Sequence, residues 1–201
     1  MQLITIAGAS GSGKTTLAEQ LASHLPGAEP VIIALDAYYY DTRCIPEQQR
    51  GTLNFDHPDA LESGLLIQQL LQLLRGEPVQ IPIYDFKFHV RSGYTSPVTA
   101  IDIIILEGIY ALYWAEIRAL SSHRIFVDTS PEACFSRRFN RDQKERGRNA
   151  DSIVSQWQTT VEPMFQTFAL PTREFATQSI SGEHDFHASV IELSRQLRGS
   201  N

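Results

Sequence analysis

The chain has 201 residues, of which 42% are hydrophobic and 20% are charged, and its formal net charge at pH 7 is -6. This composition is typical of one folded globular domain and excludes disordered and collagen-like chains. The net negative charge argues against a dedicated nucleic-acid or anionic-membrane binder, because such proteins carry a basic surplus.

Short apolar runs predict the strands of a sheet. Their near-continuous hydrophobicity is typical of parallel strands that helices cover on both faces, so the sequence predicts a single α/β domain over residues 1–201. The predicted strands are Leu3–Ala7, Val31–Leu35, Ile101–Leu106 and Arg124–Val127, with a fifth, more polar candidate at Phe175–Ile180.

Segments of helical period separate these strands. Leu17, Leu21 and Leu25 recur every four residues and predict one apolar helix face. Residues 58–74 predict a second helix with a proline in its first turn. A third helix is expected to begin at Ser130, a capping residue type that a proline and an acid follow.

Two segments depart from this alternation, and both are candidate functional insertions. Residues 79–98 predict a β-hairpin or loop excursion. Residues 137–149 are dense in charge and contain Arg-Gly-Arg near their end, which is unusual for the centre of a helix.

The cysteines and the apolar segments indicate the compartment. Cys44 and Cys134 lie far apart without a CxxC spacing, so we expect free thiols in a reducing environment. The first six residues lack the basic start of a signal peptide and are expected to form a strand. The longest apolar run, Ile103–Leu106, is far shorter than the roughly 20 residues of a membrane span. The sequence predicts a cytoplasmic protein without a membrane partner.

Residues 8–15, Gly-Ala-Ser-Gly-Ser-Gly-Lys-Thr, match the phosphate-loop pattern G-x-x-x-x-G-K-[ST] between a predicted strand and a predicted helix. Glycines let backbone N–H groups turn toward phosphate oxygens, and the following helix presents the positive end of its dipole. Lys14 is expected to reach the β- and γ-phosphates, and the Thr15 hydroxyl to bind Mg²⁺. The alternative is a flexible Gly/Ser turn. The predicted nucleotide-binding residues are Gly8, Ser10, Gly11, Ser12, Gly13, Lys14, Thr15 and Thr16.

Two acids follow predicted strands. Asp36 comes after the second apolar run and Glu107 after the third. In a parallel sheet that begins with the phosphate-loop strand, both would point from the carboxyl edge toward the γ-phosphate. One could hold Mg²⁺ and the other could accept a proton from an attacking hydroxyl. Helix or turn capping is the alternative for each.

Together these residues and several further blocks resemble the uridine kinases (uridine–cytidine kinases) of the P-loop kinase superfamily, from about residue 3 to residue 172. The more selective blocks are Asn-Phe-Asp-His-Pro-Asp-Ala at 54–60 and the arginine-rich block at 137–148. The other matching blocks are 8–16, 35–39, 81–86 with His89, 105–109, 126–129 and 161–165. The resemblance implies a P-loop kinase-type three-layer fold with a mostly parallel five-stranded sheet, a β-hairpin insertion at 79–98 and an Arg-rich lid at 137–149.

The resemblance implies that the γ-phosphoryl group of ATP or GTP moves to the 5′-hydroxyl of uridine, and also of cytidine, in pyrimidine salvage. It makes Asp36 the general base and places Thr15 and Glu107 in the Mg²⁺ shell, which Asp36 also contacts. Asp56 would accept hydrogen bonds from the ribose hydroxyls, although its position also suits a helix cap.

In the family, the hairpin folds over the pyrimidine. The resemblance therefore implies that His89 reads the edge of the base, while Tyr84 and Phe86 pack against the ring and Tyr39 contacts the nucleoside. Taken alone, an aromatic stripe of this kind is more often hairpin packing.

Arginine dominates the basic residues, at fourteen of 17, and five of them lie within 137–148. Planar guanidinium groups suit phosphate oxygens, so the resemblance implies a catalytic lid. The alternative is a solvated helix in which Asp142 and Glu145 are internal partners of the arginines. The implied residues are Arg141 and Arg146 on the triphosphate, and Arg138, Arg148 and Gln156 nearer the nucleoside.

Four features depart from the family pattern, and one of them is a shorter connection between Tyr40 and Asn54 that contains Cys44 and Pro46. Tyr40 replaces a usual basic residue, Tyr110 replaces a usual aliphatic residue, and 176–183 replaces an apolar strand followed by Arg-Gly-Gly. One alternative function is a related P-loop kinase with phosphoribulose, pantothenate or glycerate as acceptor. Another is a nucleotide-binding regulator that has lost catalysis. The resemblance also implies a homotetramer, with a small-molecule nucleoside and no nucleic acid as partner.

Overall fold

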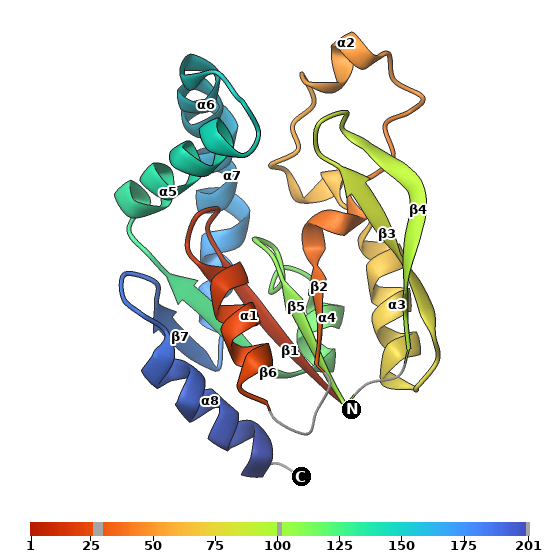
Figure 1. Ribbon diagram of the computed structural model, residues 1–201, viewed down its shortest axis with the longest axis vertical. Coiled ribbons are helices and arrows are strands. Elements are labelled where there is room, and N and C mark those ends of the chain that lie inside the picture. The colour runs from red at the N-terminus through yellow and green to blue at the C-terminus, as the bar shows by residue number, and fades with distance from the viewer. Residues whose placement is uncertain (26–29, 100–101, 200–201) are drawn as a thin grey trace.

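The computed structural model describes residues 1–25, 30–99 and 102–199, and Figure 1 shows a central sheet with helices around it. The strands of the sheet are β1 (Gln2–Gly8), β2 (Val31–Ala34), β5 (Ile103–Glu107), β6 (Ser121–Asp128) and β7 (Gln178–Ser181). They lie in the order β2-β5-β1-β6-β7, and every pairing is parallel. The predicted parallel five-stranded sheet is confirmed.

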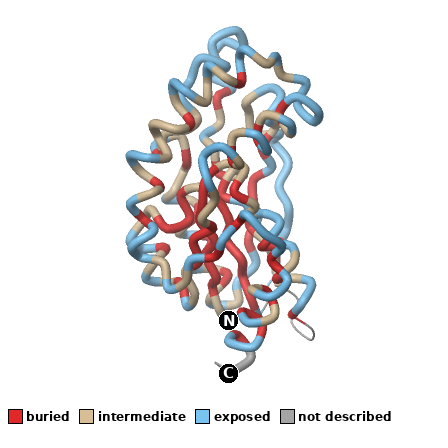
Figure 2. Tube along the Cα trace, turned by 90° about the vertical axis from the view of Figure 1, so that its left-hand side faces the viewer, coloured by how far each residue is buried: buried red, intermediate tan, exposed pale blue. Residues whose placement is uncertain are grey.

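Helices pack on both faces of this sheet. They are α1 (Lys14–Ser23), α3 (Ser63–Leu74), α4 (Ala115–Leu120) and α8 (His187–Gly199). Successive strand residues point to opposite sides, so Ile4 packs in one core with α1 and α8 while Leu3 packs in another with α3 and α4. Figure 2 shows the buried residues concentrated along the strands. The two cores and the sheet between them form three layers.

Four further helices and several single turns connect these layers. The helices are α2 (Glu47–Arg50), α5 (Pro131–Lys144), α6 (Ala150–Gln156) and α7 (Glu162–Met164). The 3₁₀ turns are Leu35–Tyr38, Pro58–Ala60 and Leu170–Phe175, and the π-helical turns are Trp157–Val161 and Phe165–Ala169. Residues 150–175 are thus helical without a break. None of the helices in the described ranges is long and apolar enough to cross a membrane.

A separate two-stranded sheet consists of β3 (Val79–Asp85) and β4 (Val90–Val98), which pair antiparallel. Gln69 of α3 joins it to the turn that follows β2. Its Nε2 donates to the Gln80 carbonyl oxygen at 2.9 Å, and its Oε1 accepts from the Tyr38 hydroxyl at 2.8 Å. Arg91 of β4 donates through Nε to the Tyr39 carbonyl oxygen at 3.0 Å. These contacts fix the hairpin against the turn that follows β2.

The prediction of one helix over 58–74 is wrong. A short 3₁₀ turn is separated from α3 by Leu61, whose backbone is extended and forms a β-bridge with Tyr39. The Glu62 N–H donates to the Tyr38 carbonyl oxygen at 2.8 Å. Backbone groups that find partners in a distant segment therefore override the local helical period.

Several predicted strand ends differ from the structure by one to three residues, and two of the differences have a clear cause. Leu35 belongs to the turn after β2 because its strand ends one residue earlier. β7 begins at Gln178 rather than Phe175, whose carbonyl oxygen accepts a side-chain hydrogen bond from Arg124 at 2.7 Å. Ile101, the predicted start of the third strand, lies outside the described residues, as do the last two residues of the predicted domain.

Candidate active site

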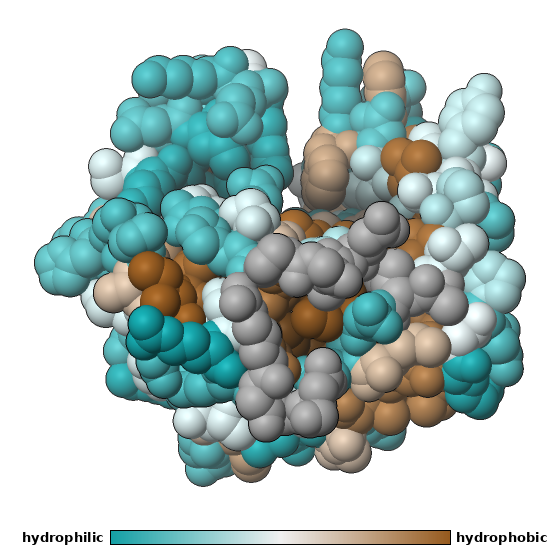
Figure 3. All heavy atoms as spheres, turned by 60° about the horizontal axis from the view of Figure 1, so that its bottom comes forward, coloured by the Kyte–Doolittle hydropathy of each residue, from teal (hydrophilic) through white to brown (hydrophobic). Residues whose placement is uncertain are grey.

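One large cavity of about 740 Å³ lies at the carboxyl ends of the strands. Figure 3 shows a cleft between the polar lobe of the lid and the opposite lobe of the molecule. The predicted site residues that line the cavity are Ser10, Lys14, Thr15, Asp36, Tyr39, Asp56, Tyr84, Phe86, His89, Glu107, Arg138, Arg141, Arg146, Arg148 and Gln156. The predicted site residues outside its wall are Gly8, Gly11, Ser12, Gly13 and Thr16.

The phosphate loop runs from the end of β1 to the start of α1. Gly11 and Gly13 have φ angles of +83° and +98°, in the left-handed region that favours glycine. A Cβ atom on Gly11 would lie 2.4 Å from the carbonyl oxygen of Cys134, so a larger residue does not fit. Lys14 folds back over the loop, where its Nζ donates to the Ala9 carbonyl oxygen at 3.4 Å. The loop and the helix after it form an anion-binding site.

Two carboxylates lie next to this loop. Glu107 is the last residue of β5, which is hydrogen-bonded to both β1 and β2. Its Oε1 accepts a hydrogen bond from Thr15 Oγ1 at 3.1 Å. Burial raises the pKa of Glu107, Lys14 opposes this shift, and the charge of Asp36 reinforces it. Both acids line the same cavity beside Lys14 and Thr15.

The oxygen donors of Thr15, Asp36 and Glu107 suit Mg²⁺. This ion prefers hard oxygen ligands and is usually held by one or two carboxylates together with substrate phosphates. In the described ranges, no group of three or more His, Cys, Asp or Glu side chains could hold a metal by itself. One hydroxyl and two carboxylates at the phosphate loop fit a magnesium ion that the phosphates of a nucleotide also bind.

Aromatic side chains form the hairpin side of the cavity. The ring of Tyr84 lies 5.2 Å from those of Tyr39 and Phe86, measured between centroids. Phe55, which the sequence reasoning missed, stacks on His89 at a centroid distance of 4.7 Å and an interplanar angle of 14°. His89 has a φ of +55°, which is uncommon outside glycine and is concentrated at functional positions. Such a wall suits a planar ring.

Two polar groups in this wall are uncharged near neutral pH. Burial lowers the pKa of His89, and the charges of Arg148 and Arg146 lower it further. Burial also raises the pKa of Tyr84 to about 12. The Tyr84 hydroxyl is buried and has no hydrogen-bond partner within the described part of the chain. Both side chains can therefore form hydrogen bonds with a ligand that carries no charge.

Asp56 lies at the edge of the aromatic wall and is held in place from three sides. Its Oδ2 accepts hydrogen bonds from Gln156 Nε2 at 3.0 Å and from Thr160 Oγ1 at 2.7 Å. The Tyr110 hydroxyl donates to its backbone carbonyl oxygen. Carboxylate oxygens are pure acceptors, so a group held in this way suits the hydroxyls of a sugar.

The capping alternative for Asp56 is wrong. His57 caps the turn instead, and its Nδ1 accepts a hydrogen bond from the Asp59 N–H at 3.1 Å. The sequence reasoning missed the contribution of Thr160, which lies in a π-helical turn that no local pattern indicates. It noted Tyr110 only as a departure, without a role.

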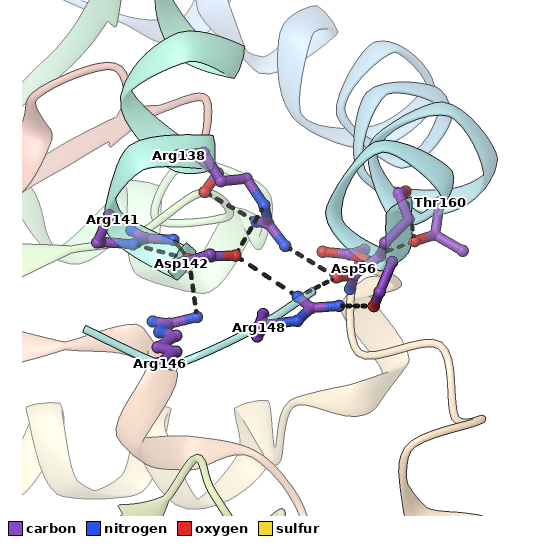
Figure 4. Close-up of polar contacts among 10 residues, drawn as sticks. Asp56, Arg138, Arg141, Asp142, Arg146, Arg148 and Thr160 are labelled. Carbon is purple, nitrogen blue, oxygen red and sulfur yellow. Dashed lines mark hydrogen bonds and ion pairs between the residues drawn. The ribbon is translucent and has the colours of Figure 1, made fainter. Parts of the chain in front are cut away.

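The lid places four arginines on the cavity wall (Figure 4). Arg138 and Arg141 belong to α5, whereas Arg146 and Arg148 flank a glycine with a φ of +61° in the loop after it. Arg138 Nη1 donates to Ser10 Oγ in the phosphate loop at 2.9 Å. Arg138 thus contacts the phosphate loop as well as the nucleoside side for which it is predicted.

Gln156 connects the lid to Asp56. Its Oε1 accepts hydrogen bonds from Arg148 Nη1 at 2.6 Å and from Arg138 Nη2 at 3.2 Å. Its Nε2 donates to Asp56, as described above. These four arginines also contact Asp142, whose side chain is completely buried. Asp142 is thus an internal partner of the arginines, as the alternative of a solvated helix expected, but the four arginines line the cavity as well.

Known proteins resemble this chain in sequence. The model of the phosphoribulokinase/uridine kinase family matches residues 3–181. The chain belongs to this family. A uridine kinase of Lactobacillus helveticus is 44% identical over 197 residues, with 96% of this chain and 93% of the relative covered. A uridine kinase of Ureaplasma parvum is 38% identical over 179 residues, with 89% and 86% covered.

Two solved structures of low sequence identity share the fold. Phosphoribulokinase from Rhodobacter spheroides has a TM-score of 0.65 at 15% identity, with 90% of this chain and 69% of that chain covered. D-glycerate 3-kinase from Cryptococcus neoformans has a TM-score of 0.60 at 15% identity, with 92% and 87% covered. These likenesses confirm the P-loop kinase fold.

The segment that departs most from the family pattern, 176–183, still provides the last strand. Gly182 follows β7, and its carbonyl oxygen accepts a hydrogen bond from Arg137 Nη1 at 2.9 Å. A Cβ atom on Gly182 would lie 2.3 Å from the carbonyl oxygen of Ser12. This member of the phosphoribulokinase/uridine kinase family thus packs the end of its edge strand directly against the phosphate loop.

Proposed function

We propose that the protein is a uridine kinase, which transfers the γ-phosphoryl group of ATP or GTP to the 5′-hydroxyl of uridine, and also of cytidine. The observation that carries this proposal is one cavity in which a phosphate loop and two carboxylates face an aromatic wall. The relatives that are uridine kinases, at 44% and 38% identity, support the same acceptor. An aromatic wall fits a pyrimidine better than it fits phosphoribulose, pantothenate or glycerate.

The donor triphosphate would lie across the phosphate loop. Backbone N–H groups and Lys14 would bind its β- and γ-phosphates. Thr15 and Glu107 would hold a Mg²⁺ ion, which neutralises charge on the phosphate oxygens when it is bound. Arg141 and Arg146 would approach the transferred group from the lid and balance the charge that develops during transfer.

Asp36 would act as the general base. It follows β2 at the carboxyl edge of the sheet and lines the cavity beside Glu107. As a carboxylate it would accept the proton of the 5′-hydroxyl while the hydroxyl oxygen attacks the γ-phosphorus. The bond between the γ-phosphorus and the oxygen bridging to the β-phosphate would break, leaving ADP.

The nucleoside would occupy the hairpin side of the cavity. Asp56 would accept hydrogen bonds from the ribose hydroxyls, next to Gln156, Arg138 and Arg148. His89 and the unpartnered Tyr84 hydroxyl would bond to the edge of the base. The rings of Tyr39 and Phe86 would pack against it.

The family resemblance further leads us to propose a cytoplasmic homotetramer. Light scattering of the purified protein at micromolar concentration would give its mass directly, and a monomeric mass would refute that part of the proposal.

The decisive assay is acceptor-dependent release of the nucleoside diphosphate, ADP from ATP and GDP from GTP. We expect turnover with uridine and cytidine and none with ribulose 5-phosphate, pantothenate or glycerate. Asp36→Asn should lower kcat by about 10²–10⁴-fold, the usual contribution of a general base, while ATP still binds. Asp59→Asn removes an exposed acid that does not line the cavity and serves as the matched control. A wild-type kcat in Asp36→Asn would refute the assignment of Asp36 as the general base.

A further inference from the structure

Asp142 lies at the centre of the lid, where its carboxylate contacts the four arginines of the cavity wall (Figure 4). Oδ1 lies 2.9 Å from Arg141 Nη2 and 3.6 Å from Arg146 Nη1. Oδ2 lies 3.5 Å from both Arg138 Nε and Arg148 Nη1. We propose that Asp142 is a positioning residue that holds these arginines where the transferring phosphoryl group needs them. This inference rests on the proposed kinase function.

Asp142 acts through the arginines and not on the substrate. Its side chain has no exposed surface and is not part of the cavity wall. The side chains of Arg141, Arg146 and Arg148 are 34%, 35% and 30% exposed and do line the cavity. A carboxylate facing a triphosphate would repel it, whereas a carboxylate behind a layer of guanidinium groups is shielded from it. The arginines thus lie between the cavity and the buried acid, which is the arrangement that an anion-binding wall requires.

The charge balance explains why one acid is enough. Four guanidinium groups held close together repel one another, and the repulsion is strong where water is excluded. One carboxylate among them reduces this repulsion and still leaves a net charge of +3 on the cluster. The cluster therefore remains attractive to phosphate while its members keep a fixed arrangement.

The loop after α5 depends on Asp142 more than the helix does. Arg148 donates through its backbone N–H to the Asp142 carbonyl oxygen at 3.1 Å, in addition to its side-chain contact. Arg146 also lies beyond the last residue of α5, so helical hydrogen bonds do not fix its position. Arg148 also donates to Gln156 Oε1 at 2.6 Å and to Ser152 Oγ at 3.0 Å, and Arg146 lies over the Phe86 ring at 5.1 Å. Without the carboxylate, we expect both side chains to shift toward these remaining partners and away from Arg138 and Arg141, because their mutual repulsion is no longer offset.

A buried acid among arginines could also serve only the stability of the fold. The two roles differ in what happens when the charge is removed. Neutral Asn at position 142 raises the net charge of the cluster from +3 to +4, so the attraction for a polyphosphate is kept. If Asp142 positions the arginines, phosphoryl transfer nevertheless becomes slower, because misplaced cations no longer match the transition state.

The test compares Asp142→Asn with the wild type at saturating ATP and uridine. Thermal unfolding and circular dichroism first establish that the variant is folded at the assay temperature. We expect kcat to fall by about tenfold or more, as is usual when reacting groups are misplaced. The Kd for inorganic tripolyphosphate, measured by calorimetry, should stay within about threefold of the wild-type value or become lower.

Glu145→Gln is the matched control. Glu145 is exposed, lies three residues after Asp142, and makes no ion pair within the described residues. The variant removes the same charge from the same segment, so kcat and the tripolyphosphate Kd should both match the wild type.

A wild-type kcat in folded Asp142→Asn would overturn the inference, and so would a clearly weaker affinity for tripolyphosphate. If Asp142→Asn does not fold, Asp142→Glu takes its place, because it keeps the charge and shifts the carboxylate by one methylene. A wild-type kcat in folded Asp142→Glu would then overturn the inference. A wild type without uridine-dependent turnover would instead refute the proposed function, so the two failures are distinguishable.

Discussion

The Tyr110 hydroxyl gives a sharp test of how the acceptor site is held. Tyr110 is 1% exposed and donates its hydroxyl hydrogen to the backbone carbonyl oxygen of Asp56. Burial raises its pKa far above the ordinary tyrosine value, so it remains a donor at any assay pH. Tyr110→Phe keeps the ring and its packing and removes only this oxygen.

The expected size of the effect of Tyr110→Phe follows from the geometry of this hydrogen bond. The hydrogen bond is partly buried, so its loss costs about 0.5–1.5 kcal/mol. For a chain of this length, each kcal/mol lowers the Tm by roughly 2–4 °C. The carboxylate of Asp56 keeps its bonds to Gln156 and Thr160, so the displacement is local to the acceptor site. Such a displacement weakens the binding free energy of uridine by about 1–2 kcal/mol. This loss raises the KM for uridine by about 5–30-fold.

The assay is ADP release with uridine varied at saturating ATP, then with ATP varied at saturating uridine. The KM for ATP should not change, because Tyr110 does not line the cavity near the phosphate loop. Tyr113→Phe is the matched control: its ring lies 5.8 Å from that of Tyr110, and its hydroxyl has no hydrogen bond in the described ranges. An unchanged KM for uridine in Tyr110→Phe, or an equal increase in Tyr113→Phe, would refute the reasoning.

Two further predictions test the hairpin and the phosphate loop. The pKa of His89 in the folded protein lies below the ordinary histidine value of 6.5. As the pH falls, the folded protein therefore protonates His89 later than the unfolded chain does. The KM for uridine should therefore stay constant from pH 8 to 6.5 and rise at lower pH. The unfolding free energy should fall as the pH drops below 6.5, because the unfolded chain binds the proton first. His89→Gln should remove this rise of KM at acidic pH, and a rise that persists in the variant contradicts the assignment. Gly11→Ala should lower stability by about 1–3 kcal/mol or more and abolish ATP binding, because Gly11 has a positive φ and its Cβ would meet the Cys134 carbonyl oxygen at 2.4 Å. Gly64→Ala, in α3 with no atom within 4 Å of the new Cβ, should be neutral or stabilising by calorimetry, and equal effects of the two changes would contradict this explanation.

Local patterns predicted the framework of the site. The phosphate loop is one continuous segment, and its glycines are required by backbone angles that the segment itself adopts. Asp36 and Glu107 could be placed together because parallel strands end at the same edge of a sheet. The strand order itself came from no local pattern, and neither did the break at Leu61, where partners come from a turn about twenty residues earlier.

By itself, the sequence determined which chemical groups are available: a phosphate loop, two acids at strand ends, an aromatic hairpin and an arginine-rich segment. Each of these depends on neighbours within a few residues, so periodicity and motif spacing contain the information. Only the tertiary structure decided which side chains hold those groups in place. Thr160 and Tyr110 both fix Asp56, and Phe55 stacks on His89. The sequence already offered Asp142 and Glu145 as partners of the arginines, and the structure decided that Asp142 contacts four of them. Most of these contacts join segments far apart in the chain, and the packing of the whole domain decides which of them form.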